Sequence, residues 1–127
     1  MAYTVTVKTT ATLEGEFLEG VATSSADGID KRSISLAEDA SNVEILQALD
    51  VSAMKGVVLL CSANATLETN STSEPDDTIE LTANRSVAWI DGQGANPFGT
   101  DVTKIYASCE AGGTLQMWFL FDSTPGV

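Results

Sequence analysis

The chain has 127 residues, which suits one domain with a single core and leaves no room for a second. It carries 18 Asp and Glu against 6 Lys and Arg and no histidine, so its formal net charge is −12. Apolar residues make up 43%, which excludes a disordered acidic tail, and the scarcity of Lys and Arg argues against nucleic-acid binding. The composition therefore predicts one acidic, soluble, folded domain.

The N-terminal 30 residues differ in composition from the rest. Residues 3–8 alternate strictly between apolar residues and Thr or Lys, as a half-buried strand does. Residues 13–20 and 23–28 are rich in Gly and Ser, and their apolar residues stand alone. We expect residues 1–30 to form either an extended arm that orders on a partner or an edge hairpin with a long loop. The main domain is then expected over residues 31–127.

Short alternating segments continue along the main domain. The chain contains 15 Thr and 12 Ser, and Thr together with Val and Ile suits half-buried strands. The segment 38–52 is ambiguous, because its apolar residues fit both a helix and a strand. The expected strands are residues 31–36, 57–61, 65–69, 78–82, 87–90, 104–107 and 114–121. Eight or more short strands separated by turn residues predict an all-β fold, a single β-sandwich of the jelly-roll type.

The two cysteines occupy matching places in an internal repeat. Asp-Val-Ser at 50–52 precedes a strand ending at Cys61, and Asp-Val-Thr at 101–103 precedes a strand ending at Cys109. If both strand ends lie at one end of the sandwich, the thiols can approach each other and form a disulfide. Free, buried thiols are the expected state in a chain without a secretion signal, and a bridge between subunits is a third alternative.

The residues available for catalysis are few. Without histidine, Ser-His-Asp and Cys-His arrangements and His-containing metal sites are excluded. A glycosidase needs only two carboxylates, but 18 acids bring some together in any fold, and so small a domain seldom provides a deep pocket. The candidate carboxylates are Asp76, Asp77, Glu80, Asp91 and Asp101. We expect no enzyme and no cofactor.

A Gly-rich loop offers oxygen ligands for a cation. Asp91, Asn96 and Asp101 bracket this loop and suit Ca²⁺, but they lack the ordered spacing of an EF-hand. The same residue types are common in turns, so we expect turns and no metal site.

Aromatic residues gather on the predicted strands. In 114–121, Met117 and Phe119 point to one face, and Trp118 and Leu120 point to the other. A strand that is apolar on both faces is either central in a sandwich or covered by a partner subunit. Trp89 would form a sugar-stacking platform if exposed, but aromatic residues at period two are more often core.

Neither a signal sequence nor a membrane span is expected. The first residues contain no basic region followed by an apolar one, so we expect no secretory signal. The longest apolar stretches, residues 56–61 and 117–121, are far shorter than the ~20 residues of a membrane helix.

Several short motifs between residues 50 and 125 match a known kind of protein. They are DVSAMK at 50–55, TLETNS at 66–71, PDDTI at 75–79, VAW at 87–89, NPF at 96–98, DVT at 101–103 and FDSTP at 121–125. With these motifs the chain resembles small virion proteins encoded in the structural modules of tailed phages. The first 40 residues show no such resemblance, and none of the matching motifs is catalytic.

The resemblance implies a non-enzymatic virion structural protein, a capsid decoration or cement protein. Its partners would be the major capsid protein and further copies of itself, with a trimer favoured by analogy. It would be made in the host cytoplasm and displayed on the capsid surface, where the acidic charge prevents promiscuous association. We expect Phe17, Leu18 and Val21 of the arm to anchor it to the shell. The alternative is a tail- or fibre-associated module, or a carbohydrate-binding β-sandwich that uses Trp89.

Overall fold

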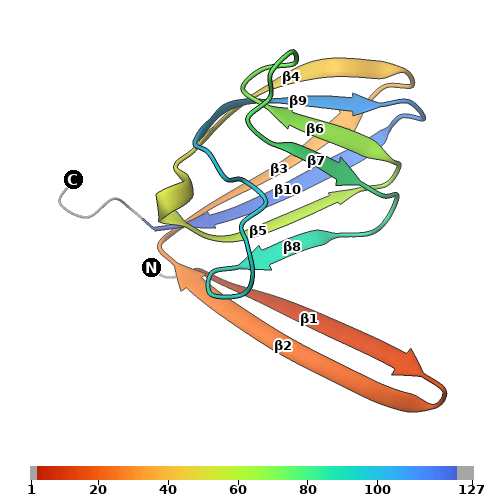
Figure 1. The fold of residues 1–127 in the computed structure, drawn as a ribbon, viewed down its shortest axis with the longest axis vertical. Coiled ribbons are helices and arrows are strands. Elements are labelled where there is room, and N and C mark those ends of the chain that lie inside the picture. The colour runs from red at the N-terminus through yellow and green to blue at the C-terminus, as the bar shows by residue number, and fades with distance from the viewer. Residues whose placement is uncertain (1–2, 123–127) are drawn as a thin grey trace.

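A computed structural model describes residues 3–122, which form a β-sandwich with a long hairpin extending from it (Figure 1). The predicted all-β sandwich is therefore confirmed. These residues contain no helix that is long and apolar enough to cross a membrane. Residues 123–125, which belong to the last motif of the resemblance, lie outside the described residues. The elements are β1 (Tyr3–Leu13), β2 (Glu16–Ala26), β3 (Gly28–Leu36), β4 (Ala40–Leu49), the 3₁₀ turn η1 (Val51–Ala53), β5 (Met54–Cys61), β6 (Ala65–Thr69), β7 (Thr78–Leu81), β8 (Val87–Ile90), β9 (Val102–Cys109) and β10 (Gly113–Phe121).

Two four-stranded antiparallel sheets make up the sandwich. Sheet 1 has the strand order β3-β10-β5-β8, and sheet 2 has the order β4-β9-β6-β7. The pairs are nested along the chain: β6 pairs with β7, β5 with β8, β4 with β9 and β3 with β10. The eight strands are thus one folded-back ribbon whose successive pairs alternate between the two sheets.

The core lies between the sheets and is built from every second residue of each strand. In β10, Leu115, Met117 and Phe119 are fully buried, which is the period-two pattern of a strand with one face on the core. Phe98 joins this core from the loop between β8 and β9, and its ring lies 6.0 Å from that of Phe119 in an edge-to-face arrangement. No strand periodicity surrounds Phe98, so its place in the core could not be predicted from the sequence.

A polar cluster closes the sandwich where the edge strands β3 and β4 meet. Gln47 is buried, and its Nε2 donates to Asp30 Oδ2 at 2.9 Å. Arg32 Nη1 donates to Gln47 Oε1 at 3.1 Å and to the Leu46 carbonyl at 2.8 Å. Charged side chains directed inward on edge strands oppose pairing with another sheet. This edge of the sandwich is therefore protected against aggregation.

The expected strands are all present, and two further strands appear. The ambiguous segment 38–52 contains β4 followed by η1. The N-terminal segment is a hairpin without a long loop, because β1 and β2 are joined by Glu14 and Gly15 alone. Both residues have positive φ angles, 50° and 82°, as a tight two-residue hairpin turn of type I′ requires. The structure thus corrects the expectation of a long loop.

Asn70 connects two loops and the start of β9 at one end of the sandwich. Its backbone φ is 67°, in the left-handed region that Asn tolerates. Its Nδ2 donates to Asp76 Oδ2 at 2.7 Å and to the Asp101 carbonyl at 2.9 Å. Its Oδ1 accepts from the Thr103 N–H at 2.8 Å and from the Thr103 hydroxyl at 3.2 Å. One side chain therefore holds the β6–β7 loop against the start of β9.

We expect Asn70→Ala to lower the free energy of unfolding by about 2–4 kcal/mol beyond its backbone cost, because several net hydrogen bonds are lost. Asn84→Ala is the matched control: Asn84 also has a positive φ, 61°, but its side chain makes no hydrogen bond among residues 3–122. Urea unfolding of both variants measures the difference. Equal losses in the two variants would contradict the role assigned to the Asn70 side chain.

Candidate interaction surface

The hairpin is the most exposed part of the described chain. β1 and β2 pair from Tyr3↔Ala26 to Leu13↔Glu16, and every residue from 8 to 21 is exposed. Figure 1 shows the hairpin extending away from the sandwich beyond β8. A two-stranded ribbon without further contacts is only marginally stable in water. Its outer half is therefore suited to a partner that covers it.

The pairing register divides the hairpin into two faces of different chemistry. The Leu18 face is mainly apolar, and the Phe17 face carries two large apolar residues among threonines and one ion pair, Lys8 Nζ to Glu19 Oε1 at 3.1 Å. By this register the Leu18 face holds Val5, Val7, Thr9, Ala11, Leu13, Glu16, Leu18, Gly20 and Ala22, and the Phe17 face holds Thr6, Lys8, Thr10, Thr12, Phe17, Glu19, Val21 and Thr23.

The three predicted partner-binding residues are all exposed but do not share one face. Leu18 is 75% exposed on its face, whereas Phe17 and Val21, at 60% and 59%, lie on the opposite one. A single flat partner surface therefore cannot cover all three. All three lie on β2, so the alternation of side chains separates Leu18 from Phe17 and Val21 once residues 16–26 are known to form a strand.

At its base the hairpin packs on the outer face of sheet 1. β2 contacts β5, β8 and β10, and Val5, Val7 and Ala22 are partly buried there. Leu120 and Ile90 occupy outward positions of sheet 1, yet they are only 1% and 3% exposed. The hairpin base thus covers this end of the sheet with its Leu18 face.

Gly56 and Asp122 mark the anchored end. A Cβ at Gly56 would lie 3.5 Å from Leu120 Cβ and 3.7 Å from Ile90 Cδ1, so these side chains flank it on the outward side. The Asp27 N–H donates to Asp122 Oδ1 at 3.1 Å, which joins the end of the hairpin to the end of β10. The hairpin is therefore fixed to the sandwich at its base alone.

The rest of the outer face of sheet 1 stays apolar and accessible. Trp118 is 45% exposed, and Val58 and Leu60 beside it on β5 are half-buried. Together with Gln116 they line a small hollow of about 110 Å³. The Lys31 ammonium lies 4.9 Å from the Trp118 ring centroid, a cation–π contact. β10 is thus central in its sheet, and its outer face around Trp118 is apolar and accessible.

Trp89 lies on the inner side of β8 and is buried, and its Nε1–H donates to the Gly94 carbonyl at 3.2 Å. It presents no exposed ring for a sugar to stack on. The alternative prediction of a carbohydrate-binding platform on Trp89 is therefore wrong. The half-exposed tryptophan is Trp118.

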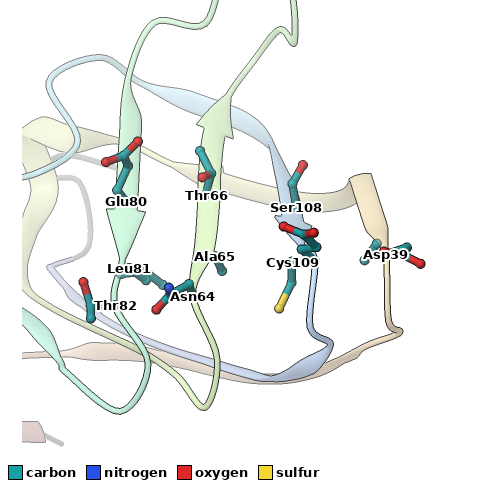
Figure 2. Close-up of a pocket in the computed structure, with 11 residues that line it drawn as sticks. Asp39, Asn64, Ala65, Thr66, Glu80, Leu81, Thr82, Ser108 and Cys109 are labelled. Carbon is teal, nitrogen blue, oxygen red and sulfur yellow. The ribbon is translucent and has the colours of Figure 1, made fainter.

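A wide, open pocket of about 640 Å³ lies on sheet 2 (Figure 2). Glu80, Thr66 and Ser108 stand opposite one another on β7, β6 and β9 and point to the same side. The Ser108 hydroxyl donates to Asn42 Oδ1 at 3.4 Å and accepts from the Asn42 N–H at 2.9 Å, so it stabilises an irregularity in β4. This pocket could not be predicted from the sequence, because its residues come from separate strands.

The candidate carboxylates Asp77, Asp91 and Asp101 each bind a different partner within the fold. Asp77 Oδ2 accepts from the Gly99 N–H at 2.9 Å, and Asp101 Oδ1 accepts from the Val51 N–H at 3.0 Å. Asp91 Oδ2 pairs with Lys55 Nζ at 3.2 Å. Asn96 Oδ1 accepts from the Phe98 N–H at 2.9 Å, so the three residues considered for Ca²⁺ serve different turns. Within residues 3–122, no three His, Cys, Asp or Glu side chains are placed to hold a metal ion.

Both cysteines are buried with free thiols at the ends of β5 and β9. Burial raises the pKa of the Cys109 thiol above its usual 9.0, and the neighbouring Cys61 raises it further, while backbone groups of Gly112 and Ala111 act in the opposite direction. The two thiols therefore lie close together, one from each sheet. A buried thiol with a raised pKa is a weak nucleophile, because the thiolate is the reactive form.

Comparison with known protein families, curated proteins and solved structures found no match to this chain. The resemblance to tailed-phage virion proteins therefore stays a prediction.

We expect neither cysteine to react with a water-soluble disulfide reagent at pH 8 while the protein is folded, and both to react once it is unfolded in guanidinium. The physical reason is burial combined with a raised Cys109 pKa, which keeps the thiolate fraction small. A spectroscopic thiol count over time measures this. The exposed variant Thr10→Cys is the control and should react at once; rapid reaction of Cys61 or Cys109 in the folded wild type would contradict the buried assignment.

Proposed function

We propose that this protein is a non-enzymatic structural protein, a capsid decoration or cement protein that binds the outer shell of a virion. The observation that carries the proposal is the hairpin, a ribbon anchored at one end whose outer half is exposed on both faces. Such an element supplies binding area at a distance from the sandwich. The major capsid protein is the proposed partner, and the capsid surface is the proposed location.

The sandwich topology supports this proposal at the level of fold. We infer that the sandwich is a jelly roll, because its four nested pairs and its two sheets of four strands are what rolling up a folded-back ribbon produces. Jelly rolls occur in viral capsid proteins and also in lectins and cupins. The fold alone therefore does not decide between these functions, and the hairpin carries the argument.

The Phe17 face is the proposed shell-binding face. Phe17 and Val21 supply apolar area, and the surrounding threonines and the Lys8–Glu19 pair supply hydrogen-bonding groups. This mixture of an apolar centre and a polar rim is typical of interfaces that form between folded partners. The free edges of β1 and β2 also offer backbone groups to a strand of the shell.

Stabilisation of the shell follows from the thermodynamic linkage between binding and shell assembly. A protein that binds the assembled shell and not its separated subunits stabilises the shell by mass action. The net charge of −12 keeps unbound copies dispersed until they reach the shell. No group on the protein has to react with anything for this function.

The test is co-sedimentation with shells assembled from the major capsid protein of the same genome. We expect the full chain to pellet with the shells. A chain lacking residues 1–26 should bind the shells about tenfold more weakly or worse, because it lacks the hairpin. This chain keeps all eight strands of the sandwich, since β3 begins only at Gly28. Phe17→Ser should weaken binding similarly.

Leu46→Ser is the matched control, since Leu46 is a large exposed apolar residue on β4, away from the hairpin. This variant should bind as the wild type does. Full binding by the chain without its hairpin would refute the anchoring role, and no binding by the wild type would refute the shell as partner.

A further inference from the structure

We propose that the Leu18 face of the hairpin binds the outer face of sheet 1 of a second copy of this chain. This contact needs no shell, so it can be tested independently of the shell binding proposed above. It assigns the two hairpin faces to two partners, the Phe17 face to the shell and the Leu18 face to another copy.

Each of the two surfaces is apolar and uncovered within residues 3–122. On the hairpin, Leu13 and Leu18 are fully exposed near the turn. On sheet 1, Trp118 and its neighbours Val58 and Leu60 form an apolar strip over β10 and β5. Apolar surface of this kind on a soluble domain marks an interaction site.

The same contact already exists within one chain. At its base the Leu18 face packs on the outer face of sheet 1 and buries Leu120 and Ile90. The proposed interface continues this contact along the same two surfaces. The outer half of the hairpin cannot complete it on its own sheet, because it extends away from the sandwich and all its residues are exposed (Figure 1). The covering surface therefore has to come from another chain.

Charge favours the pairing as well. In a protein of net charge −12, the outward positions of β3, β10, β5 and β8 carry the cation Lys31 and no Asp or Glu. The hairpin turn carries Glu14 and Glu16, which have no ion pair among residues 3–122. A hairpin laid on the sheet of another copy would bring acidic groups toward a basic, apolar strip. The charge of this strip therefore suits the acidic hairpin turn of another copy.

The geometry implies a ring. A hairpin from one copy meets a sheet on the next, so the two contacting surfaces differ and each copy has one of each. Contacts of this kind generate closed rings when the rotation between copies closes. Every copy in such a ring has its Leu18 face and its sheet 1 strip covered.

The first test is the mass in solution by light scattering after size exclusion. We expect a discrete oligomer for the wild type, and about a tenfold or greater rise in its dissociation constant for Leu18→Glu. Phe17→Glu is the matched control, one residue away on the opposite face, and should leave the oligomer intact. Circular dichroism melts confirm that both variants are folded. A monomeric wild type, or equal effects of the two variants, would overturn the proposal.

The second test identifies the surfaces directly. Leu18→Cys and Leu60→Cys chains carrying different mass tags are mixed and oxidised with diamide. We expect a disulfide between chains of different tag and very little between chains of the same tag. Leu18→Cys mixed with Leu46→Cys is the control and should not form this product. Absence of the mixed product at concentrations where the wild type is oligomeric would show that another surface holds the copies together.

Discussion

β10 is the strand on which the rest of the structure depends. It lies between β3 and β5, and its inward residues Leu115, Met117 and Phe119 are fully buried in the core. Its pairing with β3 joins the two ends of the folded-back ribbon, so the inner pairs are enclosed within it. Such long-range pairs close large loops, which is costly in chain entropy and is repaid only when the whole core is buried. The sandwich is therefore expected to form as one cooperative unit.

The same strand explains why the outer face of sheet 1 differs from that of sheet 2. β10 and β5 carry apolar residues on both faces, whereas a sandwich needs them only on the inner one. The hairpin base covers one end of this excess apolar surface, at Leu120, and leaves Trp118 accessible. Sheet 2 has instead an open polar pocket lined by Glu80, Thr66 and Ser108 (Figure 2). Most of the large exposed apolar side chains of residues 3–122 therefore lie on the hairpin and sheet 1.

Much of the fold could be predicted because strand periodicity is a local property. The ranges 65–69 and 87–90 agree with β6 and β8 residue for residue, since turn residues bound both. β4 was ambiguous because residue type does not follow burial there: polar Gln47 is buried and apolar Leu46 is exposed. The buried position of Phe98 was missed because its burial depends on Phe119, distant in sequence. Phe17, Leu18 and Val21 stand out in the sequence as candidates for partner binding, but their division between two faces follows only once residues 16–26 are known to form a strand.

The sequence by itself determined most of the strands, the acidic charge, the lack of histidine chemistry and the places of the two cysteines at strand ends. These properties follow from residue identity and from patterns only a few residues long. The tertiary structure alone decided that Trp89 is buried while Trp118 is exposed, that the candidate carboxylates serve separate turns, and that the hairpin leaves the sandwich with its Leu18 face uncovered. Each of these depends on which strands pair and which face of a strand meets the other sheet. That choice is made by long-range burial, and no local pattern contains it.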